Sequence, residues 1–188
     1  MSIKDFQQFF DYCVGHWVTE RTYHYLTEQE VERSHTEFLV EPLREELKLK
    51  VLKDNEFSTD ANVDIMPGYH LGFDTVSEKG EKVSQELNTL FVTEKQHLED
   101  NSVILQGKYL RDRAYEEERP IIADFRFDTS KRELLMTTNY TRVVAVDSIT
   151  LINPELRIRK ILTYSRPPEG EPLDKLVLVG FGVEQKTP

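Results

Sequence analysis

Residues 17 to 26 alternate strictly between two faces of an extended segment, and runs of the same kind fill most of the chain. One face of this first run carries Trp17, Thr19, Arg21, Tyr23 and Tyr25. Similar runs follow at residues 34–43, 46–52, 70–76, 87–93, 102–110, 121–127, 133–140, 143–152, 156–164 and 175–184. Turn-forming pairs such as Pro67-Gly68 separate the runs, and no strand–helix–strand alternation occurs. The pattern predicts consecutive antiparallel strands.

The first residues have a different period. Helical spacing over residues 3 to 13 places Ile3, Phe6, Phe9, Phe10 and Cys13 on one side, which predicts one short amphipathic helix. We therefore expect an all-β fold, an up-and-down antiparallel barrel of about ten strands of the lipocalin or fatty-acid-binding kind. The expected organisation is a single domain over residues 1–188, with the helix in 1–14 and the barrel in 15–186. A two-sheet sandwich is the alternative.

Composition limits the partners and the compartment. The 188 residues carry a net charge of −10, which argues against nucleic acid, since binding a phosphate backbone needs basic patches. Cys13 is the only cysteine, so no intramolecular disulfide can form, and on an apolar helix face it is more typical of packing than of a nucleophile. Without an apolar run of about 18 residues, membrane insertion is not expected. We expect an intracellular, cytoplasmic protein; if it works inside an organelle, a separate transit peptide is missing or the gene is encoded there.

Three arginines are candidates for binding an anion. Arg21 shares its predicted face with aromatic residues and can bind a carboxylate through two hydrogen bonds, although an outward arginine lying over exposed rings fits the same pattern. Arg157 and Arg159 alternate with Leu156 and Ile158, so both arginines project from one face of a strand. Spacing alone leaves open whether that face lines a cavity or meets solvent.

Other polar residues are less specific. His16 and His24 form no HxH or HxxxH pair, so no metal site is expected. Asn139 and Tyr140 lie near a strand end and Asp147 lies on the next strand, where they form either a polar cluster with an arginine or an ordinary cross-strand pairing.

Four segments, in order along the chain, resemble one known family. They are Asp5-Phe6-x-x-Phe9-Phe10, Gly15-x-Trp17-x-x-x-Arg21-Thr22-x-His24, Gly107-Lys108-Tyr109-Leu110-Arg111-Asp112-x-x-Tyr115-Glu116-Glu117-x-x-Pro120 and Asn153-Pro154-x-Leu156-Arg157-x-Arg159. In residues and spacing they are similar to the S/U-type phycobiliprotein chromophore lyases, the CpcS/CpeS family.

The resemblance implies a lipocalin-like barrel that binds a linear tetrapyrrole, phycocyanobilin or phycoerythrobilin, as substrate and holds no tightly bound cofactor. It implies an enzyme, a lyase that attaches this bilin through a thioether to a cysteine of a phycobiliprotein subunit. The implied partners are the phycobilin, the phycobiliprotein subunit and either a second S-type lyase chain or a second copy of this chain.

The resemblance also implies roles for particular residues. The arginines would bind the two propionates, and the aromatic residues would contact the rings. The bilin-binding residues implied are Arg157, Arg159, Arg21, Trp17, Tyr140 and His24. The implied catalytic positions are Asp147 and Asn139.

The chain departs from the family pattern in two places. Family members usually read Thr-Glu-Tyr-Glu-Thr where this chain has Asn139 in place of the first carboxylate, and an amide cannot accept and return a proton. The usual Glu-Arg-x-Trp-Phe is Asp147-Ser148-Ile149-Thr150-Leu151 here, so an arginine and a tryptophan are missing. These losses suit an accessory, U-type subunit of a heteromeric lyase or a non-catalytic bilin carrier. A generic fatty-acid-binding barrel is a further alternative.

Overall fold

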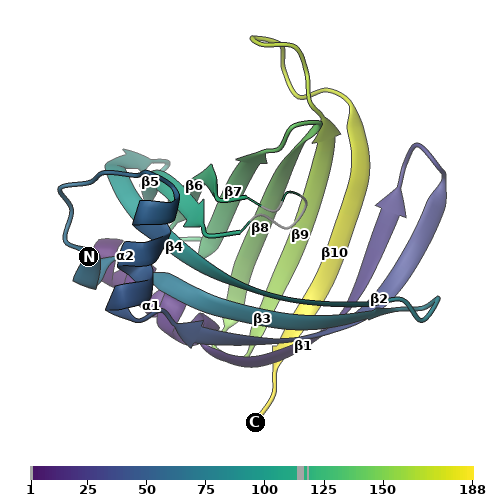
Figure 1. Cartoon of the computed structure of the whole chain (residues 1–188), viewed down its shortest axis with the longest axis horizontal. Helices are drawn as coiled ribbons and strands as arrows, with labels where there is room; N and C mark the ends of the chain where they lie inside the picture. Colours follow the sequence, from purple (N-terminus) through teal and green to yellow (C-terminus); the bar gives the residue numbers. More distant parts are fainter. Residues whose placement is uncertain (1, 114–116, 118) are drawn as a thin grey trace.

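The structure is a computed structural model, and it describes residues 2–113, 117 and 119–188 (Figure 1). Its ten antiparallel strands form a closed barrel in which each strand pairs with the next and β1 pairs with β10. The strands are β1 (Gly15–Tyr25), β2 (Glu30–Pro42), β3 (Gly68–Ser77), β4 (Lys82–Glu99), β5 (Ser102–Arg111), β6 (Ile121–Asp128), β7 (Glu133–Asn139), β8 (Val143–Asn153), β9 (Leu156–Ser165) and β10 (Leu176–Lys186). The predicted up-and-down barrel is confirmed, and the sandwich alternative is wrong. Tyr115 and Glu116 of the third sequence segment lie outside the described residues.

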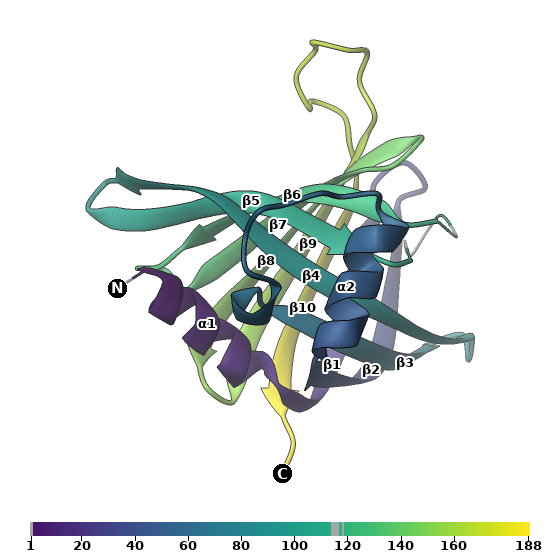
Figure 2. The ribbon, with the colours of Figure 1, turned by 60° about the vertical axis from the view of Figure 1, so that its left-hand side comes forward.

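Helix α1 (Ser2–Cys13) lies against one end of the barrel, as Figure 2 shows, and confirms the predicted N-terminal helix. Phe6, Phe9 and Phe10 are each 2% exposed and pack into the core that the strands enclose. The Phe6 ring stacks on Phe125 with a centroid separation of 5.3 Å. Full burial of each phenylalanine contributes about 1.5–3 kcal/mol, so this face holds the helix in place.

The predicted strand at residues 46–52 is wrong, because this segment is helix α2 (Glu45–Asp54). Leu47 and Val51 fit both a period of two and a helical turn, but Leu49, between them, is 50% exposed. Helix α2 lies on the outside of the barrel over β4 (Figure 2). Val51 and Leu52 are buried in a cluster with Leu90 and Val92 of β4 and Leu110 of β5. Neither helix in the described part of the chain is long and apolar enough to cross a membrane.

A buried lysine ties α2 to the loop that follows it. The Nζ of Lys48 donates hydrogen bonds to the carbonyl oxygens of Val63 and Asp64, at 3.2 and 3.0 Å. Val63 begins the 3₁₀ turn η1 (Val63–Ile65). Burial lowers the pKa of Lys48, although the nearby Asp64 carboxylate opposes this shift. The amine therefore satisfies carbonyl groups of a loop that covers α2.

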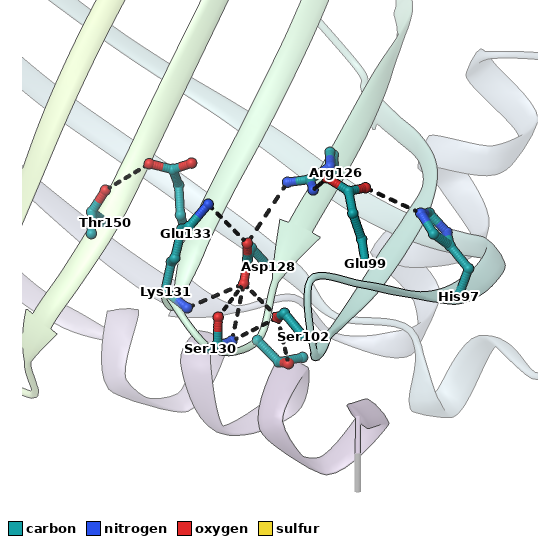
Figure 3. A network of polar contacts seen from close by, with 10 residues as sticks. His97, Glu99, Ser102, Arg126, Asp128, Ser130, Lys131, Glu133 and Thr150 are labelled. Atoms are coloured by element: carbon teal, nitrogen blue, oxygen red, sulfur yellow. Dashed lines mark hydrogen bonds and ion pairs between the residues drawn. The ribbon is translucent and has the colours of Figure 1, made fainter.

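Asp128 organises the turn after β6 (Figure 3). The residue is 3% exposed. Its Oδ1 accepts hydrogen bonds from Ser102 Oγ at 2.6 Å, from Ser130 N and Oγ at 3.1 and 2.9 Å, and from Lys131 N at 3.2 Å. Burial alone raises the pKa of Asp128, but these donors lower it well below its usual value. The charged carboxylate thus links β5 to the β6–β7 turn.

Candidate functional site

The barrel encloses a cavity of about 390 Å³, within the range of small-molecule sites. Phe9 and Cys13 of α1 line it near the helix-covered end, whereas Glu32 and Glu81 line it near the turns at the opposite end. Tyrosine, phenylalanine and aliphatic side chains form most of the remaining wall. Four arginines, Arg21, Arg111, Arg157 and Arg159, also face this space.

The face predicted for the first strand points inward. Arg21, Tyr23 and Tyr25 line the cavity, and Trp17 is fully buried. The indole Nε1 of Trp17 donates to the carbonyl oxygen of Cys13 at 2.8 Å. This bond joins the end of α1 to the beginning of β1. Trp17 is 0% exposed and does not line the cavity; it packs behind Phe38, which does.

Arg157 and Arg21 share a buried carboxylate, that of Glu184 on β10. Arg157 Nε donates to Glu184 Oε2 at 2.5 Å, and Arg21 Nη2 donates to Oε1 at 3.2 Å. The Arg157 guanidinium lies 4.2 Å from the centroid of Trp17, in cation–π contact. Burial raises the pKa of Glu184, but neighbouring guanidinium groups, that of Arg157 foremost, bring it below the ordinary value. Glu184 is therefore a carboxylate held ionised beside two cations.

Sequence reasoning missed Glu184. Its only signal is the alternation Gly180, Gly182, Glu184 on one face of β10, where small residues leave room for large side chains opposite. An added Cβ at Gly182 would come within 2.8 Å of Thr19 Oγ1 and 3.1 Å of Arg21 Cγ. The glycine thus makes space for the arginine that Glu184 binds.

Arg159 and Asp147 form a second ion pair, on neighbouring strands β9 and β8. Arg159 Nη2 lies 3.2 Å from Asp147 Oδ2. Burial lowers the pKa of Arg159, but Asp147 raises it above the ordinary value overall. Asp147 Oδ1 and Arg159 Nε are both buried without a hydrogen-bond partner among the described residues. The pair therefore leaves one acceptor and one donor unused.

Arg111, at the end of β5, is the fourth inward arginine, and the sequence reasoning assigned it no role. It is 8% exposed and donates through Nη2 to the hydroxyl oxygen of Tyr140 at 2.8 Å. The guanidinium carbon lies 5.4 Å from the ring centroid of Tyr109 and 5.7 Å from that of Tyr140. Tyr140, predicted as a ring contact, is thus in the cavity wall with its hydroxyl tied to a cation.

Two predicted site residues lie outside the cavity. His24 is exposed on β1, because Tyr23 and Tyr25 on either side face inward. Asn139 is exposed at the end of β7, because its neighbours Thr138 and Tyr140 face inward. The predictions that His24 contacts the ligand and that Asn139 takes part in catalysis are therefore wrong in position.

The missing arginine and tryptophan of the family pattern also fall outside the cavity. On β8 the residues that line the cavity are Ala145, Asp147 and Ile149. Ser148 and Thr150 occupy the positions of the family's arginine and tryptophan. They alternate with the cavity-lining residues along β8, so they project to the outer face. The position of the family carboxylate keeps a carboxylate, Asp147, and this one faces the cavity.

A closed barrel around a charged, aromatic cavity defines a ligand-binding protein of the lipocalin-like class. The family model described as CpeS-like protein matches residues 5–187. The chain belongs to this CpeS-like family, and the resemblance stated from the four sequence segments is confirmed.

Relatives and one solved structure agree with this assignment. The chain is 59% identical, over 98% of both chains, to chromophore lyase CpcS/CpeS 1 of Synechococcus sp. (strain JA-3-3Ab). It is 26% identical to the phycocyanobilin lyase subunit CpcS of Picosynechococcus sp., over 84% of this chain and 77% of that one. The S-type phycobiliprotein lyase CPES of Guillardia theta has the same fold, with a TM-score of 0.73 over 97% of this chain and 93% of that chain at 15% identity.

Proposed function

We propose that this protein is a phycobilin lyase, which binds a linear tetrapyrrole in the barrel and promotes its thioether attachment to a cysteine of a phycobiliprotein subunit. The observation that carries the proposal is the set of inward arginines and the carboxylate Asp147 in an aromatic cavity, in a chain 59% identical to a protein named as a chromophore lyase. A bilin has two propionates, a conjugated ring system and pyrrole N–H groups, and each finds a matching group here. The phycobilin is a substrate, and the proposal requires no tightly bound cofactor.

Arg159 and Arg157, with Arg21, are proposed to bind the propionates. Glu184 holds Arg157 and Arg21 in place, so these cations are pre-organised before the ligand enters. Arg159 retains an unused buried Nε. Tyr140 is proposed to contact a ring of the bilin, whereas Trp17 is fully buried and therefore supports the Arg157 guanidinium from behind instead of forming the predicted ring contact.

The acceptor thiol belongs to the partner, and Cys13 is buried in the core beside Phe9 and Phe10. The partner's thiolate adds to the ethylidene carbon on ring A of the bilin, where a carbon–sulfur bond forms. The electron pair of the carbon–carbon double bond then takes up a proton, so nothing is oxidised or reduced. Asp147 is proposed to bind pyrrole N–H groups through its unpaired Oδ1 and to handle this proton.

The test is co-expression with a bilin-producing pathway and separate phycobiliprotein subunits, with and without an S-type partner chain. Covalent adduct is scored by zinc-enhanced fluorescence on denaturing gels. We expect adduct with the wild-type chain and at least tenfold less with Asp147→Asn or Arg159→Gln, whereas Lys160→Gln, an exposed neighbour on β9, should behave as wild type.

Adduct that forms only with the partner chain would make this protein an accessory subunit. Absence of adduct in every combination, with bilin still bound, would leave a carrier. The carrier hypothesis was motivated by Asn139, which lies on the outer face, so no observation in the cavity now favours it. The proposed site of action is the cyanobacterial cytoplasm or the plastid stroma; the two lyase relatives above come from cyanobacteria.

A further inference from the structure

Arg111 differs from the other three inward arginines in having no carboxylate partner among the residues that the structure describes. Arg21 and Arg157 bind Glu184, and Arg159 binds Asp147. No ion pair involves Arg111 among the described residues, and its Nε is buried without a hydrogen-bond partner there. Burial of this guanidinium, 8% exposed, removes its hydration, and only the Tyr109 and Tyr140 side chains and the more distant Asp147 offset that loss in the described part of the chain.

The surroundings of Arg111 keep it in place. The Asn55 side chain, at the end of α2, donates to the Arg111 carbonyl oxygen at 3.0 Å. The next residue, Asp112, accepts hydrogen bonds from the backbone and side-chain amides of Asn88, both at 2.8 Å. With the Tyr140 hydroxyl on Nη2, the backbone and the guanidinium are both fixed before any ligand enters.

We propose that Arg111 is an anion-binding residue of the cavity and binds one carboxylate of the ligand, a propionate if the proposed bilin function holds. A carboxylate that binds the paired arginines shares them with Glu184 or Asp147, whereas no carboxylate of the described residues contacts Arg111. Asp147 is the carboxylate that acts on it through space, and Tyr109 and Tyr140 are the other titratable groups facing it. Arg111 lies on β5, away from Arg157 and Arg159 on β9, so two carboxylates of one ligand can be held at separate walls.

The experiment compares a diacid with its uncharged ester on the same protein. Wild type, Arg111→Met and the control Lys108→Met, an outward residue of the same strand, are titrated with phycocyanobilin and with its dimethyl ester by absorbance. We expect Arg111→Met to bind the free acid about 10- to 100-fold more weakly than wild type does, because a hydrogen bond to a charged group is lost. Its affinity for the ester should be unchanged. Arg111→Lys should recover part of the loss.

Thermal unfolding of each variant separates binding from folding. An Arg111→Met protein that unfolds at or above the wild-type temperature shows that the arginine is not needed for the fold. Equal weakening of acid and ester, or no weakening of either, would overturn the proposal.

If the wild-type protein binds neither bilin, the proposed function fails, and the anion site is tested separately. The probes are then 8-anilinonaphthalene-1-sulfonate, which is anionic, and Nile red, which is uncharged. An Arg111→Met variant that loses affinity for the sulfonate dye but keeps its affinity for Nile red supports the anion site. Loss of both dyes, loss of neither, or failure of the wild-type protein to bind the sulfonate overturns it.

Discussion

Replacing Glu184 by glutamine removes a buried negative charge that two arginines share. Glu184 is fully buried, and the side chains of Arg157 and Arg21 are 5% and 14% exposed. Both carboxylate oxygens are used, at 2.5 and 3.2 Å. Removing one partner of a buried ion pair lowers the free energy of unfolding by about 3–5 kcal/mol, because the remaining charge is left uncompensated. Since glutamine keeps one acceptor oxygen, we expect the lower end, about 3 kcal/mol.

The free energy of unfolding is measured by urea titration, with thermal unfolding as a second assay. A loss of about 3 kcal/mol in a chain of this size lowers Tm by about 6–12 °C. The matched control is Asp124→Asn, which breaks the exposed pair with Lys108 and should change stability by less than about 1 kcal/mol. In the double variant Glu184→Gln/Arg157→Met, part of the loss should return, since no unpaired guanidinium is left at position 157.

The stability difference between wild type and Glu184→Gln should depend on pH. The pKa of Glu184 is lower in the folded than in the unfolded chain, so its contribution is complete above the unfolded value of about 4.3 and is lost as pH falls. The stabilities of wild type and Glu184→Gln should therefore converge on acidification. A cost at neutral pH no larger than that of the Asp124 control, or a difference that does not shrink in acid, would refute this account of the charge cluster.

Three further outcomes are expected. Asp128→Asn should lower the free energy of unfolding in urea at neutral pH by about 1–3 kcal/mol, since several donors lose a charged acceptor. Because the pKa of Asp128 is lowered in the folded chain, this difference from wild type should diminish as pH falls; a difference that does not depend on pH would contradict the account. Lys48→Met should cost about 1–3 kcal/mol and increase hydrogen exchange around residues 63–65, whose carbonyl groups lose their donor. Cys13→Ala should retain bilin transfer, because the proposed function places the acceptor thiol on the partner and Cys13 is buried; abolished transfer in a folded variant would assign Cys13 a chemical role.

The alternation along the chain was sufficient to predict the strands but not all the elements. Ten of the eleven predicted extended runs are strands, and the exception, residues 46–52, is a helix. In that short run Leu47 and Val51 satisfy both periods, and only the position of Leu49, half exposed on α2, distinguishes them. Short apolar runs carry this ambiguity in general.

The candidate site was partly predictable. Arg21, Arg157 and Arg159 were selected by residue type and strand position, and all three face the cavity. Glu184 was missed because a lone carboxylate near the end of a strand usually meets solvent. Arg111 stood inside a recognised segment, but nothing in its sequence context separates a buried cation from an exposed one.

By itself the sequence determined the type of structure, because side-chain period, turn residues and the amphipathic first segment each depend only on neighbours along the chain. Only the tertiary structure decided which face of each strand looks inward. A period of two defines two faces without saying which is enclosed, and closure of β1 onto β10 settles that for every strand at once. Closure also brought Arg21 of β1 and Arg157 of β9 to the same carboxylate, that of Glu184 on β10. Arg21 is 163 positions from Glu184 in the sequence, and Arg157 is 27 positions from it.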